Sequence, residues 1–263
     1  MNKTKIVSIA NQKGGVGKTT SALNMGTALA LRGYRTLIID LDPQGNASTG
    51  LGVSLENREY SSYDLLFSDQ SLADLSQSLP IENLFILPSS NDLSSADAEL
   101  GVSKSKLSQL SLSISKSDHD YDYIFIDCPP SLTLLTLNAF VASDTILVPL
   151  QAEFFALEGL SQLLMTVREV RQSANRRLRI SGIFLTMYDG RNKLCRQVES
   201  DARDNLGDLV YKTKIPRNVK LSEAPSFGMS IIEYEPHSRG AIAYRNLACE
   251  FLERDHLETV LND

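Results

Sequence analysis

The stretch NQKGGVGKTT at residues 11–20 follows a short apolar run, IVSIA, at residues 6–10. Closely spaced glycines let the main chain turn tightly, so that successive N–H groups can point inward at an anion. A helix that starts directly after such a loop adds the positive end of its dipole. The stretch therefore predicts a phosphate-binding loop between a strand and a helix, in which Lys18 pairs with the β- and γ-phosphates and the Thr19 hydroxyl binds Mg²⁺.

Apolar runs of strand length recur along the rest of the chain. After residues 6–10 we expect strands at residues 36–40, 83–87, 123–127, 145–150 and 180–185. Helices are expected between most of them, at residues 19–31, 96–112, 134–142, 157–171, 191–206 and 240–257. Apolar strands separated by helices are typical of a mostly parallel sheet covered on both faces. The sequence thus predicts a doubly wound α/β fold, in one domain over residues 1–263, because no repeat or Pro/Gly-rich linker interrupts the pattern.

Charge is distributed unevenly along this acidic chain. The formal net charge is -6, yet residues 168–220 hold 13 Lys/Arg and 6 Asp/Glu, a balance of +7. The remainder of the chain then carries -13. This polarity indicates one anion-seeking face, although solvated helix faces that happen to fall together would give the same count.

Cysteine usage and the first residues indicate a cytosolic protein. The three cysteines are far apart and form no CxxC pair, and residues 1–10 do not resemble a secretion signal. Reduced thiols are therefore expected. No apolar run reaches membrane-spanning length, and the three scattered histidines give no support to a transition-metal site.

Carboxylates come at the ends of two predicted strands. Asp40 and Asp42 close the second strand, and Pro43 ends its hydrogen-bonding ladder. Asp127 follows four apolar residues at 123–126, which is a Walker B pattern, and such an aspartate holds Mg²⁺ directly or through water. Carboxylates that cap strands are common by themselves, but the phosphate loop upstream favours a metal role for Asp127.

A second lysine precedes the glycines, and glutamine stands at position 12 where the usual phosphate loop has glycine. This KGGVGKT sequence at residues 13–19 resembles the deviant Walker A motif of the ParA/MinD group of ATPases. The resemblance implies ATP and Mg²⁺ as ligands, and a homodimer in which Lys13 reaches across a sandwiched nucleotide to the partner's phosphates. The other interpretation of Lys13 is a solvent-facing loop lysine.

The resemblance extends to the acidic segment DLDPQGN at residues 40–46, which is similar to the group's Walker A′ motif. It implies that Asp42 orients the attacking water and that Asp40 supports the metal shell around Thr19 and Asp127. The catalytic residues so implied are Lys13, Lys18 and Asp42. The nucleotide-binding residues are Lys13, Gly14, Gly15, Val16, Gly17, Lys18, Thr19, Thr20, Pro216, Arg217 and Asn218.

The last third of the chain narrows the likeness to one family. The sequence IPRNVKLSEAPS at residues 215–226 and residues 235–248 resemble the chromosomal ParA/Soj proteins. This implies that adenine packs near residues 216–218. It also implies that Arg191, Arg217 and Lys220, all within the +7 stretch, hold double-stranded DNA without reading its sequence, by neutralising phosphates. Arg191 and Lys220 could instead pair internally with Asp189 and Glu223.

The family implies a DNA-partitioning ATPase of the cytoplasm and nucleoid, whose hydrolysis a ParB-like partner stimulates. A MinD-like membrane-associated ATPase is the alternative, but that class uses a basic C-terminal helix, whereas residues 251–263 are acidic. An iron–sulfur electron carrier of similar fold would need cysteines placed to bridge a dimer. A small-molecule kinase or ligase gains no support from the Arg191 and Lys220 segments.

Overall fold

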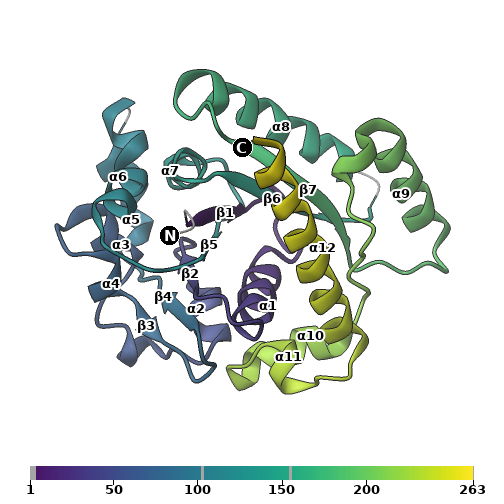
Figure 1. Cartoon of the computed structure of the whole chain (residues 1–263), viewed down its shortest axis with the longest axis horizontal. Helices are drawn as coiled ribbons and strands as arrows, with labels where there is room; N and C mark the ends of the chain where they lie inside the picture. The colour runs from purple at the N-terminus through teal and green to yellow at the C-terminus, as the bar shows by residue number, and fades with distance from the viewer. Residues whose placement is uncertain (1–3, 102–103, 154–155, 263) are drawn as a thin grey trace.

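The computed structural model describes residues 4–101, 104–153 and 156–262, and its centre is one seven-stranded sheet (Figure 1). The strand order is β3-β4-β2-β5-β1-β6-β7; β3 is antiparallel to β4, and the other neighbours are parallel. The strands are β1 (Lys5–Ile9), β2 (Thr36–Asp40), β3 (Gln77–Ser78), β4 (Leu84–Leu87), β5 (Tyr123–Asp127), β6 (Thr145–Gln151) and β7 (Arg179–Thr186).

Helices cover both faces of this sheet. The α-helices are α1 (Lys18–Ala30), α2 (Asn46–Gly50), α3 (Ser62–Phe67), α4 (Leu72–Leu75), α5 (Leu93–Leu100), α6 (Gln109–Lys116), α7 (Leu134–Ala142), α8 (Ala156–Ser173), α9 (Lys193–Leu206), α10 (Val219–Glu223), α11 (Ile231–Tyr234) and α12 (Arg239–Asn262). Short 3₁₀ turns are η1 (Leu55–Asn57), η2 (Lys104–Ser108), η3 (Gly207–Leu209) and η4 (Ala224–Phe227).

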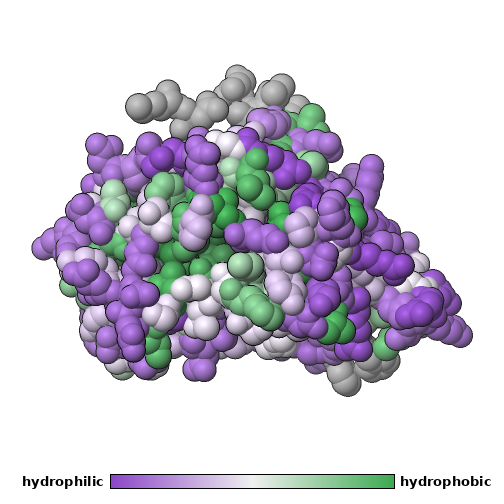
Figure 2. Space-filling model, turned by 90° about the horizontal axis from the view of Figure 1, so that it is seen from below, coloured by the Kyte–Doolittle hydropathy of each residue, from purple (hydrophilic) through white to green (hydrophobic). Residues whose placement is uncertain are grey.

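Two apolar clusters hold the layers together. Side chains of α3 to α8 pack on one face of the sheet, and side chains of α1, α11 and α12 pack on the other. The face seen from below is mostly hydrophilic, with a hydrophobic area left of centre (Figure 2). This arrangement confirms the predicted doubly wound α/β class and the six predicted strands, whose ends are shifted by at most one residue.

One local prediction is wrong, and one predicted helix starts two residues late. The expected single helix over residues 96–112 is two helices, because Gly101 follows α5 with a φ of 55°, a left-handed conformation that ends a helix. The helix expected from residue 191 begins at Lys193, where the Asn192 side chain accepts a hydrogen bond from Leu194 N and caps the helix. Strand β3 was not expected, since two residues are too few to show a period.

The sheet register determines where the functional segments meet. Asp127 at the end of β5 lies beside Ile9 of β1 on one side and Asp40 of β2 on the other. Since these strands are parallel, their carboxyl ends share one edge of the sheet. The glycine-rich loop and both acidic segments therefore emerge at the same edge, which is where doubly wound folds bind ligands.

Candidate nucleotide-binding site

The glycine-rich loop between β1 and α1 has the conformation that its glycines allow. Gly15 and Gly17 have φ values of 74° and 91°, which side chains with a Cβ rarely adopt. Gly17 is the N-cap of α1, so the positive end of this 13-residue helix opens into the loop. Thr186 on β7 donates from its hydroxyl to Val16 O over 2.9 Å and fixes the loop against the sheet.

A cleft of about 640 Å³ opens over this loop. Its walls come from the loop, from the segment after β2, and from the C-terminal third of the chain. The residues are Gly14, Gly15, Gly17, Lys18, Thr19, Thr20, Leu23, Asp42, Gln44, Asn46, Thr49, Gly50, Pro130, Met187, Leu221, Ser222, Pro225 and Ser226. The structure thus brings most of the predicted loop residues together with Asp42.

A smaller cavity of about 310 Å³ adjoins the cleft and shares Gly17 and Thr20 with it. The predicted base-binding residues Pro216, Arg217 and Asn218 all line this cavity. Their segment is positioned by main-chain hydrogen bonds from Ile215 N to Leu185 O and from Tyr188 N to Ile215 O. A flat group bound here would lie beside the start of α1, while an attached phosphate would reach the loop.

Lys18 is buried at the bottom of the cleft. Its Nζ donates to Lys13 O over 3.0 Å, so that the side chain curls back along the loop. Burial lowers the pKa of the Lys18 ammonium, and the Asp127 carboxylate opposes this shift. A buried cation with a single main-chain partner is well suited to meet a phosphate, since it has donors left over.

Asp127 is the most unusual group of the site. It is completely buried, and neither carboxylate oxygen has a hydrogen-bond partner among the residues described. Burial, and after it the nearby Asp40 carboxylate, raise the pKa of Asp127 well above its usual range. The Thr19 hydroxyl lies close enough to lower this pKa somewhat, but it is outside hydrogen-bond geometry. Keeping a carboxylate in this state is costly, and the cost is expected where a group is reserved for a ligand.

Asp40 differs from Asp127 because its oxygens are used within the chain. Its Oδ2 accepts hydrogen bonds from Ser48 N at 2.8 Å and from the Ser48 hydroxyl at 2.6 Å. Burial raises the pKa of Asp40 to about 6, although the Ser48 hydrogen bonds act in the opposite direction. Asp40 therefore holds the acidic segment to α2, and its support of a metal shell stays a prediction.

Lys13 lies at the rim of the site, where its ammonium contacts the carboxylate of Glu153 just after β6. About 40% of each of the two side chains is exposed. Nearby, Asn11 donates from Nδ2 to Pro149 O over 2.8 Å and accepts from Lys13 N over 3.0 Å, which ties the start of the loop to β6. The structure thus assigns Lys13 a partner that the sequence did not indicate.

The predicted DNA-binding residues lie on neighbouring segments next to the small cavity. Arg191 forms a two-bonded pair with Asp189, from Nε to Oδ1 at 3.0 Å and from Nη2 to Oδ2 at 2.9 Å. Lys220 Nζ lies 2.7 Å from Glu223 Oε2. Exposed Arg217 adjoins the Arg191 loop, because its N donates to Tyr188 O over 3.3 Å. Arg191 and Lys220 are thus paired internally, as the alternative interpretation held.

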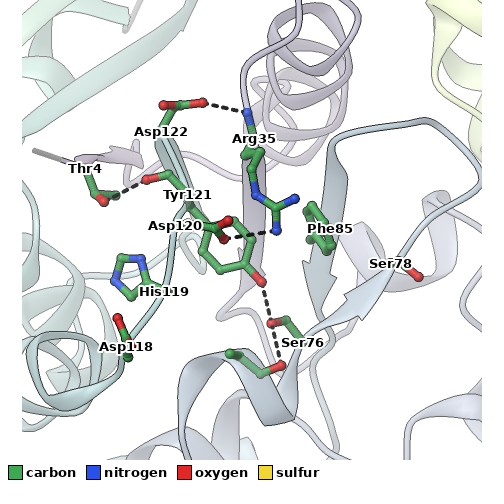
Figure 3. Close-up of a pocket in the computed structure, with 11 residues that line it drawn as sticks. Thr4, Arg35, Ser76, Ser78, Phe85, Asp118, His119, Asp120, Tyr121 and Asp122 are labelled. Atoms are coloured by element: carbon green, nitrogen blue, oxygen red, sulfur yellow. Dashed lines mark hydrogen bonds and ion pairs between the residues drawn. The ribbon is translucent and has the colours of Figure 1, made fainter. Parts of the chain in front are cut away.

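A second cavity, of about 730 Å³, lies at the opposite edge of the sheet (Figure 3), and we call it the N-terminal cavity. It is lined by Thr4, Arg35, Ala73, Ser76, Ser78, Phe85, Asp118, His119, Asp120, Tyr121 and Asp122. Figure 3 shows Arg35 between Phe85 and Asp120; its guanidinium lies 4.8 Å from the ring centroid and 3.0 Å from the carboxylate. None of these lining residues is a glycine, and the Arg35 cation among them is already paired with Asp120.

Several residues around the cleft were not predicted as site residues. Gln44 and Asn46 belong to the acidic segment at residues 40–46, Thr49 follows it, and Ser222 and Pro225 belong to the stretch at residues 215–226. Proximity in sequence to a recognised motif was the available signal for them. Glu153 and Arg58, which contacts the acidic segment from outside, gave no such signal.

Comparison with known proteins agrees with this geometry. A family model described as an AAA domain matches residues 4–180. The chain is 48% identical over 256 residues to the chromosome partitioning protein ParA of Caulobacter vibrioides, covering 97% of this chain and 96% of that one. It is 50% identical over 246 residues to the sporulation initiation inhibitor protein Soj of Bacillus subtilis, covering 94% and 97%.

Among solved structures, the fold is similar to cobyrinic acid a,c-diamide synthase from Mycobacterium smegmatis with bound ADP and magnesium. The TM-score is 0.80 at 36% identity, and the match covers 94% of this chain and 93% of that one. The likeness to all three proteins includes both the phosphate loop and the C-terminal third, because each match covers nearly the whole chain.

Proposed function

The chain belongs to the ParA/Soj family of chromosome-partitioning ATPases, and on this premise we propose how it works. ATP and Mg²⁺ bind in the cleft, and two ATP-bound chains form a homodimer. The dimer binds double-stranded DNA of any sequence on the nucleoid. A ParB-like activator stimulates hydrolysis, after which the dimer separates and releases the DNA.

One observation carries this proposal: the buried carboxylate of Asp127 lies near the loop lysine and has no hydrogen-bond partner within the part of the chain that the structure describes. Both of its oxygens are free to accept a cation, and the Thr19 hydroxyl lies next to it. Hard oxygen ligands of this kind suit Mg²⁺, which keeps several waters and takes few protein ligands. Thr19 and Asp127 would hold the ion, which would neutralise charge on the β- and γ-phosphate oxygens.

The chain's own groups then have separate tasks in hydrolysis. Lys18, which is buried and lines the cleft, would donate to the phosphates without reorganisation of its surroundings. Asp42 lines the same cleft and would orient the attacking water. Its main chain is fixed on the other side, because the Ser89 hydroxyl donates to Asp42 O over 2.6 Å.

Lys13 links the nucleotide to dimerisation in this proposal. In the single chain its ammonium contacts Glu153, and both side chains are substantially exposed. Exposed ion pairs stabilise proteins by at most about 1 kcal/mol, so a phosphate on the partner could replace Glu153 at small cost. Lys13 lies at the rim of the cleft, so its side chain could reach a second chain that faces the cleft.

DNA binding is proposed for the face that carries Arg191, Arg217 and Lys220. The carboxylates of Asp189 and Glu223 neutralise two of these residues in the single chain, again in exposed pairs. Phosphates can take the place of such carboxylates, and counterion release then favours binding at low salt. Two copies of the face in a dimer would bind much more tightly than one, since the second contact is intramolecular.

The membrane-associated alternative receives less support. Within the residues described, none of the helices combines the length and apolar character needed to cross a membrane. Leu247 and Phe251 bury one side of α12 against the sheet, and Lys5 Nζ pairs with Asp255 Oδ1 at 2.6 Å. A helix held in this way is not available to lie in a lipid surface.

The deciding experiment measures molecular mass and DNA affinity with ATP and with ADP. We expect a monomer with ADP, a dimer with ATP and Mg²⁺, and binding to random duplex DNA only in the second case, weakening steeply between two salt concentrations. Lys13→Ala should keep ATP binding and lose the dimer. Equal mass and equal DNA affinity with both nucleotides would contradict the proposal.

Variants of the other site residues separate the steps. Asp42→Ala should form a dimer that stays on DNA, because hydrolysis no longer ends the cycle. Arg191→Glu and Lys220→Glu should weaken DNA binding while ATP-driven dimerisation persists. Lys116→Glu, an equal charge change at an exposed residue at the end of α6, is the control and should leave DNA binding intact. If it weakens DNA binding equally, net charge and not the proposed face is responsible.

A further inference from the structure

Arg58 packs behind the acidic segment that carries Asp42, outside the cleft itself. Its guanidinium donates to main-chain carbonyls of Val53 at 3.1 Å, of Ser89 at 3.2 Å and of Gly45 at 3.4 Å, and to the Thr49 hydroxyl at 2.7 Å. The acceptors come from two places: the stretch at residues 45–53, which contains α2, and Ser89 after β4. One side chain therefore joins two segments that are separate in the sequence.

The partners of Arg58 are unusual for a partly buried arginine. All of them are neutral oxygens, and no carboxylate lies within ion-pair distance among the residues described. Burial lowers the pKa of Arg58, and the nearby Asp40 charge opposes this shift. Neutral acceptors stabilise a guanidinium less than a carboxylate does, so the arrangement serves the shape of the segment more than charge pairing.

The segment that Arg58 holds forms the wall of the cleft facing the phosphate loop. Gln44, Asn46 and Thr49 line the cleft, whereas Arg58 does not. Ser89, whose carbonyl accepts from Arg58, also donates from its hydroxyl to Asp42 O. Ser89 thus links the guanidinium to Asp42 through two hydrogen bonds. The guanidinium also bonds Gly45, which is three residues after Asp42 in the chain.

We propose that Arg58 is a positioning residue for ATP hydrolysis, which clamps residues 44–49 and so holds Asp42 in line with the γ-phosphate. The inference rests on the proposed function of the cleft. Arg58 touches neither nucleotide nor water in this scheme. It acts only through the segment, so its loss lowers turnover without weakening ATP binding.

The glycine at position 45 supports the clamp. Gly45 has a φ of 62°, and a Cβ at this position would collide with Arg58 Nη1. The turn therefore approaches the guanidinium as closely as a residue without a side chain permits. A close approach of this kind is a reason for glycine beyond its main-chain conformation.

The test compares Arg58→Gln and Arg58→Lys with Arg32→Gln. Arg32 is the matched control, because it also donates to main-chain carbonyls, of Ala28 and Arg245, but lies just beyond the far end of α1. We expect Arg58→Gln to lower kcat for ATP about 10-fold or more, with KM within about twofold of the unchanged chain. Arg58→Lys should recover little of kcat, since one ammonium cannot replace the fork of donors that reaches both residues 45–53 and Ser89. Arg32→Gln should leave kcat unchanged.

Hydrogen exchange of residues 44–50 gives a readout that does not depend on hydrolysis. Arg58→Gln should speed exchange there severalfold and leave α12 unaffected. Unchanged kcat and unchanged exchange would overturn the clamp. Full activity of Arg58→Lys would also overturn it, because charge alone would then suffice. If the unchanged chain hydrolyses no ATP, the proposed function fails, and the exchange of residues 44–50 still decides whether the clamp exists.

Discussion

The two edges of the sheet offer cavities of similar size but different chemistry. The cleft at the carboxyl ends of the strands has about 640 Å³, and the N-terminal cavity has about 730 Å³. Both are lined by basic, acidic and aromatic or apolar side chains. Beside the cleft, at the end of β5, Asp127 is buried with no hydrogen-bond partner among the residues described. In the N-terminal cavity Arg35 Nε and His119 Nδ1 also have no hydrogen-bond partner among the residues described, but the Arg35 charge is paired with Asp120.

This difference teaches that unpaired buried charge, and not volume, marks the site. Charges that meet each other across a cavity are already stabilised and gain little from a ligand. Charges held apart from water and from partners are stabilised only when a ligand arrives.

Lys18→Ala should produce the largest change. Loss of the buried ammonium should weaken ATP binding by about 100-fold or more, because several charge-assisted hydrogen bonds to phosphate disappear together. A fluorescent ATP analogue titrated into the protein measures this. Lys116→Ala on α6 is the control and should bind like the unchanged chain. Tight binding by Lys18→Ala would place the phosphates elsewhere.

Asp127→Asn should change activity and stability in opposite directions. Mg²⁺-dependent hydrolysis should fall by roughly 100-fold, since the amide is a poor ligand for the ion. The nucleotide-free chain should melt a few degrees higher, because a neutral amide is less costly to bury than a carboxylate. Thermal melts and phosphate release measure the two effects. A lower melting temperature would mean that Asp127 has partners in the folded chain.

The pH dependence of stability should report Asp40. Its pKa of about 6 in the folded chain exceeds the usual 3.8, so its stabilising effect is complete below about pH 3.8 and is lost as pH rises through 6. Asp40→Asn lacks this titration. The free energy of unfolding of Asp40→Asn, measured relative to that of the unchanged chain, should therefore rise by on the order of 2–3 kcal/mol between pH 4 and pH 7. Urea unfolding at both pH values measures the gain, and a constant difference would contradict it.

Arg35→Gln in the N-terminal cavity should have the smallest effect. It removes a partly exposed ion pair with Asp120 and the contact over Phe85, which together stabilise the fold by about 1 kcal/mol. ATP binding and turnover should not change. A clear loss of turnover would break the contrast between the two edges, because it would give the N-terminal cavity a part in the reaction.

Much of the fold followed from local pattern. The apolar strands were predictable because buried parallel strands are runs of Val, Ile and Leu. The glycine loop was predictable because phosphate loops have glycines and a lysine at set positions. Gly101 was overlooked as a helix end, since a single glycine within an apolar-periodic stretch is compatible with a continuous helix. Strand β3 forms only because Gln77 meets Ile86 of β4, a contact that no local pattern contains.

The sequence by itself determined which groups the site would contain: the loop glycines, Lys18 and the strand-end carboxylates, because their chemistry needs fixed residue types at fixed spacing. Tertiary structure alone decided which of those groups would have partners. Asp40 is satisfied by Ser48 while Asp127 is left without a hydrogen bond, and Lys13 meets Glu153 from 140 residues away. Such pairings depend on how distant segments pack, and burial then sets how much each unpaired charge costs.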